Sequence, residues 1–263
     1  MKNTVQSYNN FLYFCSKISL TMRYKITLSY NGKNYHGWQL QPNAVTVQEV
    51  LDKALTTLLK ENISTLGAGR TDTGVHAAFF AAHFDCTKEI SDTDYLVYKL
   101  NRFLPSDIAV FGVEKVTEDF NARFSAKSRT YKYLIHLRKD VFLNESSWFF
   151  PQDLDIDLMQ KGCEILKQND DFASFCKAGA DNKTTICKLY EAFFIKDGHK
   201  IVFTVKADRF LRNMVRALVG TLTDLGSKKI TLEEFSNIIK AKNRTKAGQS
   251  VPAHALSLVG IEY

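Results

Sequence analysis

The run at positions 67–76, Gly-Ala-Gly-Arg-Thr-Asp-Thr-Gly-Val-His, contains residue types that could do chemistry. Asp72 follows Arg70 by two residues, and glycines flank the pair on both sides. Glycine allows sharp turns and the close approach of another group, and a neighbouring guanidinium favours the ionised form of a carboxylate. Such a carboxylate could act as a nucleophile or a base. An ordinary aspartate-stabilised turn would use the same residues, so the rest of the chain has to decide.

A second tract, residues 121–135, interleaves basic and aromatic side chains. Its cations and rings are Arg123, Lys127, Arg129, Lys132, Phe124, Tyr131 and Tyr133. Cations bind phosphates while aromatic rings stack on bases, a combination suited to flexible or flipped-out nucleotides. Taken alone, the tract also fits a strand with a basic solvent face and a tyrosine face toward the core.

A third candidate is the segment 209–222, where Arg212 and Arg216 stand four residues apart among apolar residues. The helical spacing of its apolar residues predicts a helix from about Leu211, with Gly226 placed to end it. An arginine at the edge of the buried face needs a carboxylate partner or must reach solvent along its stem. Spacing alone does not choose between these.

The tripeptide Asp-Thr-Gly at 72–74 also matches the short signature of aspartic proteases. Their chemistry needs two carboxylates that share a proton, and the chain has no second Asp-Thr-Gly or Asp-Ser-Gly. The residues before Asp72 are Gly-Arg-Thr rather than an apolar strand, and the adjacent arginine opposes the raised pKa that one member of the dyad requires. The sequence therefore argues against a protease.

Composition indicates a globular protein that favours polyanions. The 263 residues carry 35 Lys+Arg against 28 Asp+Glu, a net charge of +7 with a sequence pI near 9.0, and a basic surface suits nucleic acid. Five scattered cysteines without a Cys-x-x-Cys pair argue against a disulfide framework and fit reduced, cytoplasmic thiols. The scattered histidines predict no metal site. Residues 1–21 lack the pattern of a signal peptide or membrane span, so we expect a dispensable extension that is disordered or not native.

The elements that must position these candidates alternate between strands and helices. Period-2 patterns predict strands at 24–30, 77–84, 108–116, 131–137, 188–195, 200–206 and 255–261, with Asp197-Gly198 as a hairpin turn. Helical spacing and capping signals predict helices after Thr46, at 93–103, at 154–166 and after Thr231. Hairpins in place of strict strand–helix–strand alternation indicate an α+β fold with a largely antiparallel sheet.

Five stretches, in order along 22–263, together resemble the pseudouridine synthases of the tRNA pseudouridine synthase A type. They are YNGKNYHGWQLQ with TVQ at 46–48, GAGRTDTGVHA, FNARFSAKSRTYKY, FLRNMVRALVG and SVPAHALSLVGI. GRTD is the form typical of that type, where other branches of the superfamily commonly carry GRLD. Thr73 stands where Ala is frequent in the family.

The resemblance implies a role for each matching residue. Asp72 would be the nucleophile, Arg216 would pair with it, and Arg70 would help extrude the target base. Tyr131 would pack against the uracil, and Arg123 and Arg212 are the further candidates for substrate binding.

The resemblance also implies an architecture and a substrate. Two similar α+β halves, expected at 22–120 with the catalytic loop and at 121–263, would surround a continuous sheet with a basic central cleft. A homodimer without metal or cofactor would isomerise uridine to pseudouridine at positions 38, 39 and 40, in the anticodon arm of tRNA. The alternative is a non-catalytic RNA-binding protein or tRNA chaperone of the same fold, although a binder of phosphates has no need of a carboxylate there.

Overall fold

The computed structural model describes residues 21–180 and 183–263. The extension expected at 1–21 therefore lies, apart from Thr21, outside the described residues. Within the described part, no helix is long and apolar enough to cross a membrane.

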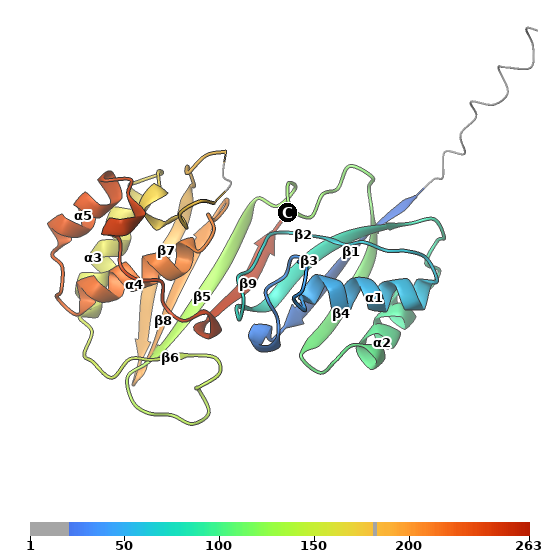
Figure 1. Ribbon diagram of the computed structural model, residues 1–263, viewed down its shortest axis with the longest axis horizontal. Helices are drawn as coiled ribbons and strands as arrows, with labels where there is room; N and C mark the ends of the chain where they lie inside the picture. Colours follow the sequence, from blue (N-terminus) through green and yellow to red (C-terminus); the bar gives the residue numbers. More distant parts are fainter. Residues whose placement is uncertain (1–20, 181–182) are drawn as a thin grey trace, which may run out of the picture.

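A single mixed sheet runs through the molecule, in the strand order β4-β1-β3-β9-β5-β8-β7, with β2 on β3 and β6 on β5 (Figure 1). The strands are β1 (Met22–Tyr30), β2 (Leu66–Gly67), β3 (His76–Cys86), β4 (Ile108–Val116), β5 (Ser128–His136), β6 (Trp148–Phe149), β7 (Leu189–Asp197), β8 (Lys200–Ala207) and β9 (Leu256–Glu262). The β3–β9 and β5–β6 pairs are parallel and the remaining pairs are antiparallel. The expected α+β class with a largely antiparallel sheet is confirmed.

The last strand, β9, connects the two halves of the sheet. β9 lies between β3 and β5 in Figure 1, pairing parallel to β3 at His76↔Ser257 and Ala77↔Leu258, and antiparallel to β5 along most of its length. The residues that close the chain thus form the middle of the sheet. The start of β3, which carries the end of the 67–76 run, is therefore separated from β5 by β9 alone.

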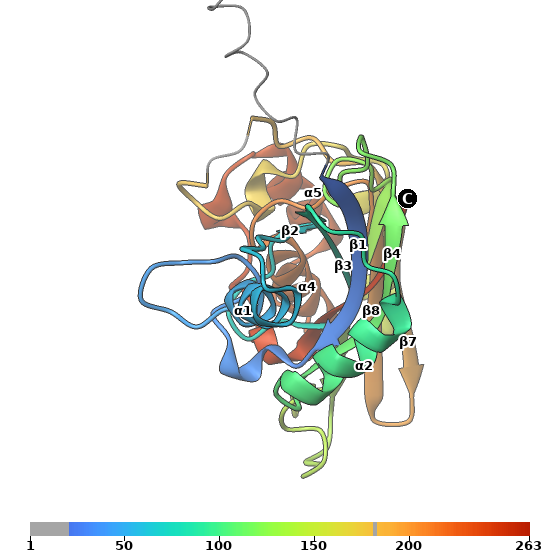
Figure 2. The ribbon, with the colours of Figure 1, turned by 90° about the vertical axis from the view of Figure 1, so that its right-hand side faces the viewer.

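Helices cover the sheet in two groups. They are α1 (Val47–Leu59) and α2 (Thr93–Phe103) near β1 and β4, and α3 (Ile156–Lys167), α4 (Met214–Gly226) and α5 (Leu232–Lys240) near β7 and β8. Short 3-10 helices are η1 (Gly32–Asn34), η2 (Ala173–Phe175), η3 (Arg244–Lys246) and η4 (Ala253–Ala255). Figures 1 and 2 show α1, α4 and α5 on one face of the sheet. The Thr46 hydroxyl caps α1 at Glu49, and Thr231 with Glu234 forms the expected reciprocal capping box of α5.

Each helix group packs on its own apolar core. One buried cluster joins α1 and α2 to β1, β3 and β4, and a second joins α3, α4 and α5 to β5, β7 and β8. The partly buried Tyr131 ring packs against both clusters. The junction between the cores is therefore where β3, β9 and β5 meet.

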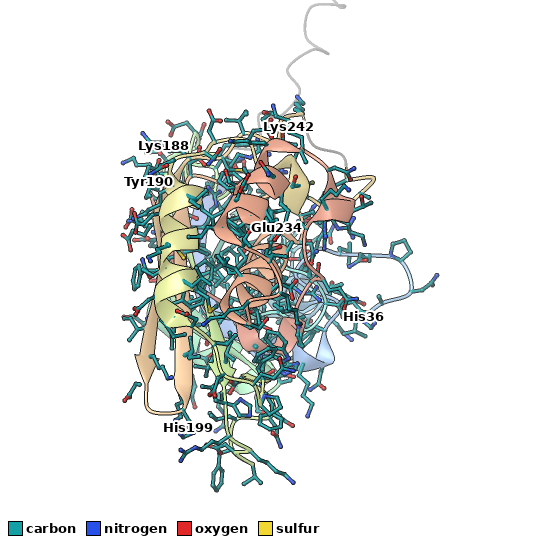
Figure 3. All side chains as sticks on the ribbon, turned by 90° about the vertical axis from the view of Figure 1, so that its left-hand side faces the viewer. His36, Lys188, Tyr190, His199, Glu234 and Lys242 are labelled. Atoms are coloured by element: carbon teal, nitrogen blue, oxygen red, sulfur yellow. The ribbon has the colours of Figure 1, made fainter. Side chains whose placement is uncertain are left out.

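The expected hairpin near Asp197 is confirmed, with Gly198 at a φ of +56° in the turn between β7 and β8. Figure 3 shows His199 at the turn, and Lys188 and Tyr190 at the opposite end of the hairpin, toward Lys242. The hairpin is thus the outer edge of the sheet, away from the junction.

Candidate active site

The run at 67–76, here called the catalytic loop, links β2 to β3 at the junction of the two cores. A hydrogen bond from the Ala68 N–H to the Ala81 carbonyl (2.8 Å) ties the start of the loop to β3, and one from the Val75 N–H to the Asp72 carbonyl (3.1 Å) closes a turn at its end. Gly74 adopts a φ of +78°, a conformation that favours glycine. Asp72 is therefore the first residue of the turn that leads into β3.

A second loop, residues 31–38, supports the catalytic loop from behind. The Gly74 N–H donates to the Tyr35 carbonyl (3.3 Å), and the Gly32 N–H donates to Nδ1 of His76 (3.0 Å). Gly37 has a φ of +85°, and a Cβ there would lie 2.2 Å from the Thr71 carbonyl oxygen. Only glycine allows this approach, which explains why the YHGW stretch belongs to the site although it carries no catalytic group.

Thr71 is an anchor that the sequence did not indicate. Its buried hydroxyl lies 2.9 Å from the phenolic oxygen of Tyr30, which is itself buried at the end of β1. This hydrogen bond fixes the residue before Asp72 against the first core. A threonine between an arginine and an aspartate looks like a surface residue, so no local pattern could have marked it.

Asp72 and Arg216 form the charged pair of the site. Oδ2 of Asp72 lies 3.5 Å from Nη1 of Arg216, and their side chains are 28% and 22% exposed. Nε of Arg216 donates to the Val251 carbonyl at 2.7 Å, which fixes the guanidinium from the other side. Arg216 thus has the carboxylate partner that its place at the edge of an apolar helix requires. The carboxylate stays accessible to a reactant.

Tyr131 lies on β5 beside this pair. Burial raises the pKa of its phenol well above the usual range, and the nearby Asp72 carboxylate raises that pKa further. The phenol is therefore protonated at neutral pH and cannot act as a base there. Its ring meets Phe210 edge-on at 5.1 Å between centroids. The arrangement provides a neutral aromatic wall next to an ionisable carboxylate.

The other sequence candidates are placed differently. Arg70 is exposed on the catalytic loop. Arg123 is exposed on the turn before β5, close to the loop, because the Arg129 guanidinium donates both to the Arg123 carbonyl and to the Ala68 carbonyl. The structure therefore brings Asp72, Tyr131 and Arg216 together and places Arg70 and Arg123 nearby.

Arg212 does not share a helix with Arg216. The helix predicted from Leu211 begins at Met214, because Asn213 takes a left-handed conformation with a φ of 65° and ends the preceding turn. Arg212 is exposed, and its carbonyl accepts from the Lys177 N–H at 3.0 Å. The expectation of one continuous helical face was wrong at this end.

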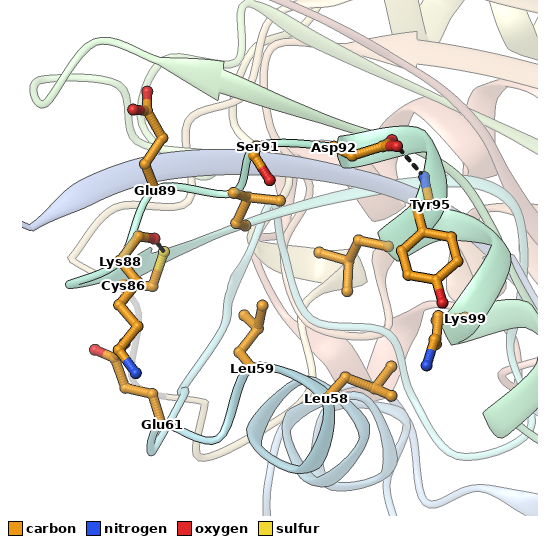
Figure 4. Close-up of a pocket in the computed structure, with 12 residues that line it drawn as sticks. Leu58, Leu59, Glu61, Cys86, Lys88, Glu89, Ser91, Asp92, Tyr95 and Lys99 are labelled. Atoms are coloured by element: carbon orange, nitrogen blue, oxygen red, sulfur yellow. Dashed lines mark hydrogen bonds between the residues drawn. The ribbon is translucent and has the colours of Figure 1, made fainter.

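A pocket of about 330 Å³ lies elsewhere, between the end of α1 and the start of α2 (Figure 4). Its lining comprises Leu58, Leu59, Glu61, Cys86, Lys88, Glu89, Ile90, Ser91, Asp92, Tyr95, Leu96 and Lys99. It includes none of the six candidate site residues. Among residues 21–180 and 183–263, no group of three or more His, Cys, Asp or Glu side chains could hold a metal ion.

Comparison with known proteins identifies the family. The family model described as tRNA pseudouridine synthase matches residues 26–125 and 169–263. A protein of Parabacteroides distasonis named tRNA pseudouridine synthase A is 49% identical over 241 residues, which cover 92% of this chain and 96% of that protein. Proteins of the same name from Bacteroides fragilis (48% identity; 92% of this chain, 96% of that one) and Caldicellulosiruptor bescii (39%; 90% and 98%) are similar over comparable lengths. The chain therefore belongs to the tRNA pseudouridine synthase family.

Proposed function

We propose that this protein isomerises uridine to pseudouridine in tRNA, with Asp72 as the nucleophile. The observation that carries the proposal is the ion pair of Asp72 and Arg216, which is about a quarter exposed and lies beside the Tyr131 ring. The names of the relatives support tRNA as the substrate and an isomerase as the class of enzyme.

The reaction breaks the bond from N1 of uracil to the ribose, turns the base, and joins C5 to the same carbon. C5 loses its proton to solvent and N1 takes one up, so the product is an isomer of the substrate and nothing is oxidised or reduced. Cleavage of a glycosidic bond develops positive charge on the sugar, which a nearby carboxylate can stabilise or trap. Asp72 supplies that carboxylate. Arg216, which also donates to the Val251 carbonyl, holds it in place.

The freed uracil must stay in the site while it turns. Tyr131 offers a flat, uncharged surface that belongs to both cores, so it cannot swing away without disturbing the packing of either. A base stacked in a helix must first be flipped out, at a cost of a few kcal/mol. We assign Arg70, which is exposed two residues before Asp72, to the place that the base leaves in the stack.

Substrate binding would use the basic surface of the chain. Arg123 and Arg212 are exposed, and we assign them to the RNA contact. Phosphate contacts of this kind make binding weaken steeply with salt. We assign the modified positions to 38, 39 and 40, in the anticodon arm, and propose a homodimer whose protomers each have halves at 22–120 and 121–263. The two apolar cores support these halves, with β9 crossing into the first.

Mapping tests the proposal directly. The purified protein is incubated with an unmodified tRNA transcript, and pseudouridine is located by carbodiimide treatment and blocked reverse transcription. We expect stops for positions 38–40 with the wild-type protein and none with Asp72→Asn. Tritium release from 5-tritiated uridine gives an independent measure of turnover.

Absence of pseudouridine with the wild-type protein would overturn the proposal. Pseudouridine only outside the anticodon arm would overturn the assigned positions while leaving the reaction in place. Sedimentation at micromolar concentration tests the homodimer separately.

A further inference from the structure

Arg129 occupies an unusual position between the catalytic loop and the rest of the molecule. It lies on β5 two residues before Tyr131, and alternate residues of a strand point to the same face. Its guanidinium donates to four backbone carbonyls on three segments: Ala126 (3.0 Å) and Arg123 (2.5 Å) in the turn before β5, Asp208 (2.8 Å) and Ala68 (2.9 Å). One side chain thus joins the catalytic loop, the turn before β5 and the residue after β8.

These bonds need the shape of a guanidinium. Nη2 binds the Ala68 and Arg123 carbonyls together, and Nη1 binds the Ala126 and Asp208 carbonyls. A planar fork with several fixed donors can do this, whereas a lysine ammonium is a single point of donation. Burial is also the main cause that lowers the pKa of Arg129, as expected for a cation whose partners are neutral carbonyls.

The turn at 121–126 is held rigid from several other directions. The Asn121 carboxamide oxygen accepts from the N–H groups of Arg123 and Phe124, both at 3.0 Å. Ala122 is fully buried; its N–H donates to Nδ1 of His83 (3.1 Å), and its carbonyl accepts from the Tyr263 hydroxyl (3.0 Å). The turn therefore has a fixed backbone.

The side chains at the tip of this fixed turn nevertheless point away from the core. Phe124 is 77% exposed, and the Arg123 guanidinium lies 5.3 Å from the centre of its ring. A ring with a cation against it suits single-stranded or flipped-out nucleotides, because the ring stacks on a base while the cation meets a phosphate. A pre-ordered aromatic loses little conformational freedom when it binds.

We propose that Arg123 and Phe124 form a stacking contact for an RNA nucleotide beside the target one, and that Arg129 is a positioning residue that fixes this contact relative to Asp72. The proposal rests on the proposed function, since it takes the RNA substrate from there. Because the Ala68 and Arg123 carbonyls share one nitrogen of Arg129, the turn and the catalytic loop keep a constant offset. The strand and the flipped base would then be held in one register.

Binding tests the contact without turnover. In the Asp72→Asn background, the dissociation constant for an unmodified tRNA transcript is measured by fluorescence anisotropy at fixed salt. We expect Phe124→Ala to weaken binding roughly tenfold, within the range of one base–aromatic stack, and Phe124→Trp to bind within about threefold of the parent. Phe142→Ala is the matched control, since Phe142 is 91% exposed on the loop between β5 and β6.

Binding by Phe124→Ala within about twofold of the parent would overturn the contact. An equal loss in Phe142→Ala would overturn it as well, because any exposed phenylalanine would then serve. These outcomes are independent of the reaction. A wild-type protein that makes no pseudouridine but needs Phe124 for RNA would contradict the proposed function alone.

A double-mutant cycle tests the positioning role. If Arg129 places Phe124, then Phe124→Ala should cost roughly tenfold in the parent but less than about threefold when Arg129→Lys is already present. A purely structural Arg129 would leave the two effects multiplicative, and that result would overturn the role. Should Arg129→Lys fail to fold, Arg129→Gln, which keeps a planar group with two N–H donors, takes its place in the cycle.

Discussion

Two regions of the molecule, the junction at Asp72 and the pocket between α1 and α2, differ in how their charged groups are used. In the pocket, Glu61 accepts from the backbone and hydroxyl of Thr87, and Asp92 caps α2. Both carboxylates therefore accept hydrogen bonds that stabilise the fold. At the junction, Asp72 has Arg216 as its ion-pair partner and keeps 28% of its side chain exposed. The pocket has room for a ligand but no free carboxylate among these two, whereas the junction has a carboxylate that is held in place and still accessible.

The two regions also differ in which apolar cores surround them. The pocket belongs to one apolar core, whereas the junction takes Asp72 from one side and Arg216 and Tyr131 from the other. Contacts from both sides fix the side chains of Asp72, Arg216 and Tyr131 relative to both cores. Substitutions at the junction should therefore affect the reaction strongly, and those in the pocket should not.

The largest effect is expected for Asp72→Asn. The carboxamide has the same shape but no charge, so it cannot trap a developing cation, and pseudouridine formation should fall below detection. Affinity for tRNA should stay within about tenfold, since the phosphate contacts remain. Tritium release and filter binding check the two statements, with Asp52→Asn as the matched substitution in the same half. Turnover that survived in Asp72→Asn would remove the nucleophile from the mechanism.

Arg216→Lys should be the next most damaging change. Nε of Arg216 binds Val251 while Nη1 faces Asp72, and a lysine can satisfy only one of them. Loss of the second contact should lower the single-turnover rate about 100-fold, equivalent to ~2.7 kcal/mol. Arg212→Lys, the same substitution at an exposed position, should change that rate less than about threefold. Equal losses in both variants would mean that the effect does not depend on the particular contacts of Arg216 with Asp72 and Val251.

Asp52 gives a smaller effect, on stability. It lies on α1, its Oδ1 accepts from the N–H and hydroxyl of Thr65, and burial outweighs these bonds to raise its pKa from 3.8 to about 6. A raised pKa means that its stabilising contribution is present below pH 3.8 and is lost as the pH rises through 6.

Asp52→Asn keeps the acceptor oxygen and removes the titration. After allowance for partial solvent exposure, we expect the variant to gain about 1 kcal/mol in free energy of unfolding at pH 8 relative to its difference from wild type at pH 4. Urea denaturation at the two pH values measures this. A difference between the two proteins that did not vary with pH would show that Asp52 is solvated.

Local patterns predicted the elements better than the joins between them. The helix at Thr93–Phe103 and the strand at Ile108–Val116 have the predicted bounds, because periodicity and a terminating Pro105 coincide there. The left-handed Asn213 interrupts an apolar pattern that runs on unchanged. The parallel pairing of β3 with β9 covers only two residue pairs, which lie about 180 positions apart in the sequence. The periodicity of a strand does not indicate which distant strand it pairs with.

The same distinction applies to the candidate site. The loop sequence itself predicts Asp72 as a candidate, and the resemblance to a family predicts Tyr131 and Arg216. The sequence does not predict the residues that hold the site in place. Thr71 hydrogen-bonds to Tyr30, and Arg129 donates to four backbone carbonyls, and both sets of contacts exist only in the folded chain. Residue types and the family motifs therefore predict the groups that could react. The residues that position those groups depend on tertiary contacts, which the sequence pattern does not show.

The smallest effect is expected in the pocket, with Tyr95→Ala and Lys99→Ala combined. Tyr95 is 56% exposed on α2, stacked on Tyr98 at 6.3 Å, with the Lys99 ammonium 5.2 Å from its ring centre. Alanine favours a helix, so the fold should tolerate both changes. Pseudouridine formation and tRNA affinity should stay within about twofold of wild type, because neither side chain reaches the junction. A tenfold loss of affinity with an unchanged single-turnover rate would instead place RNA on α2. RNA would then contact both the junction and the pocket. The two regions would differ in their part in the reaction but not in their part in substrate binding.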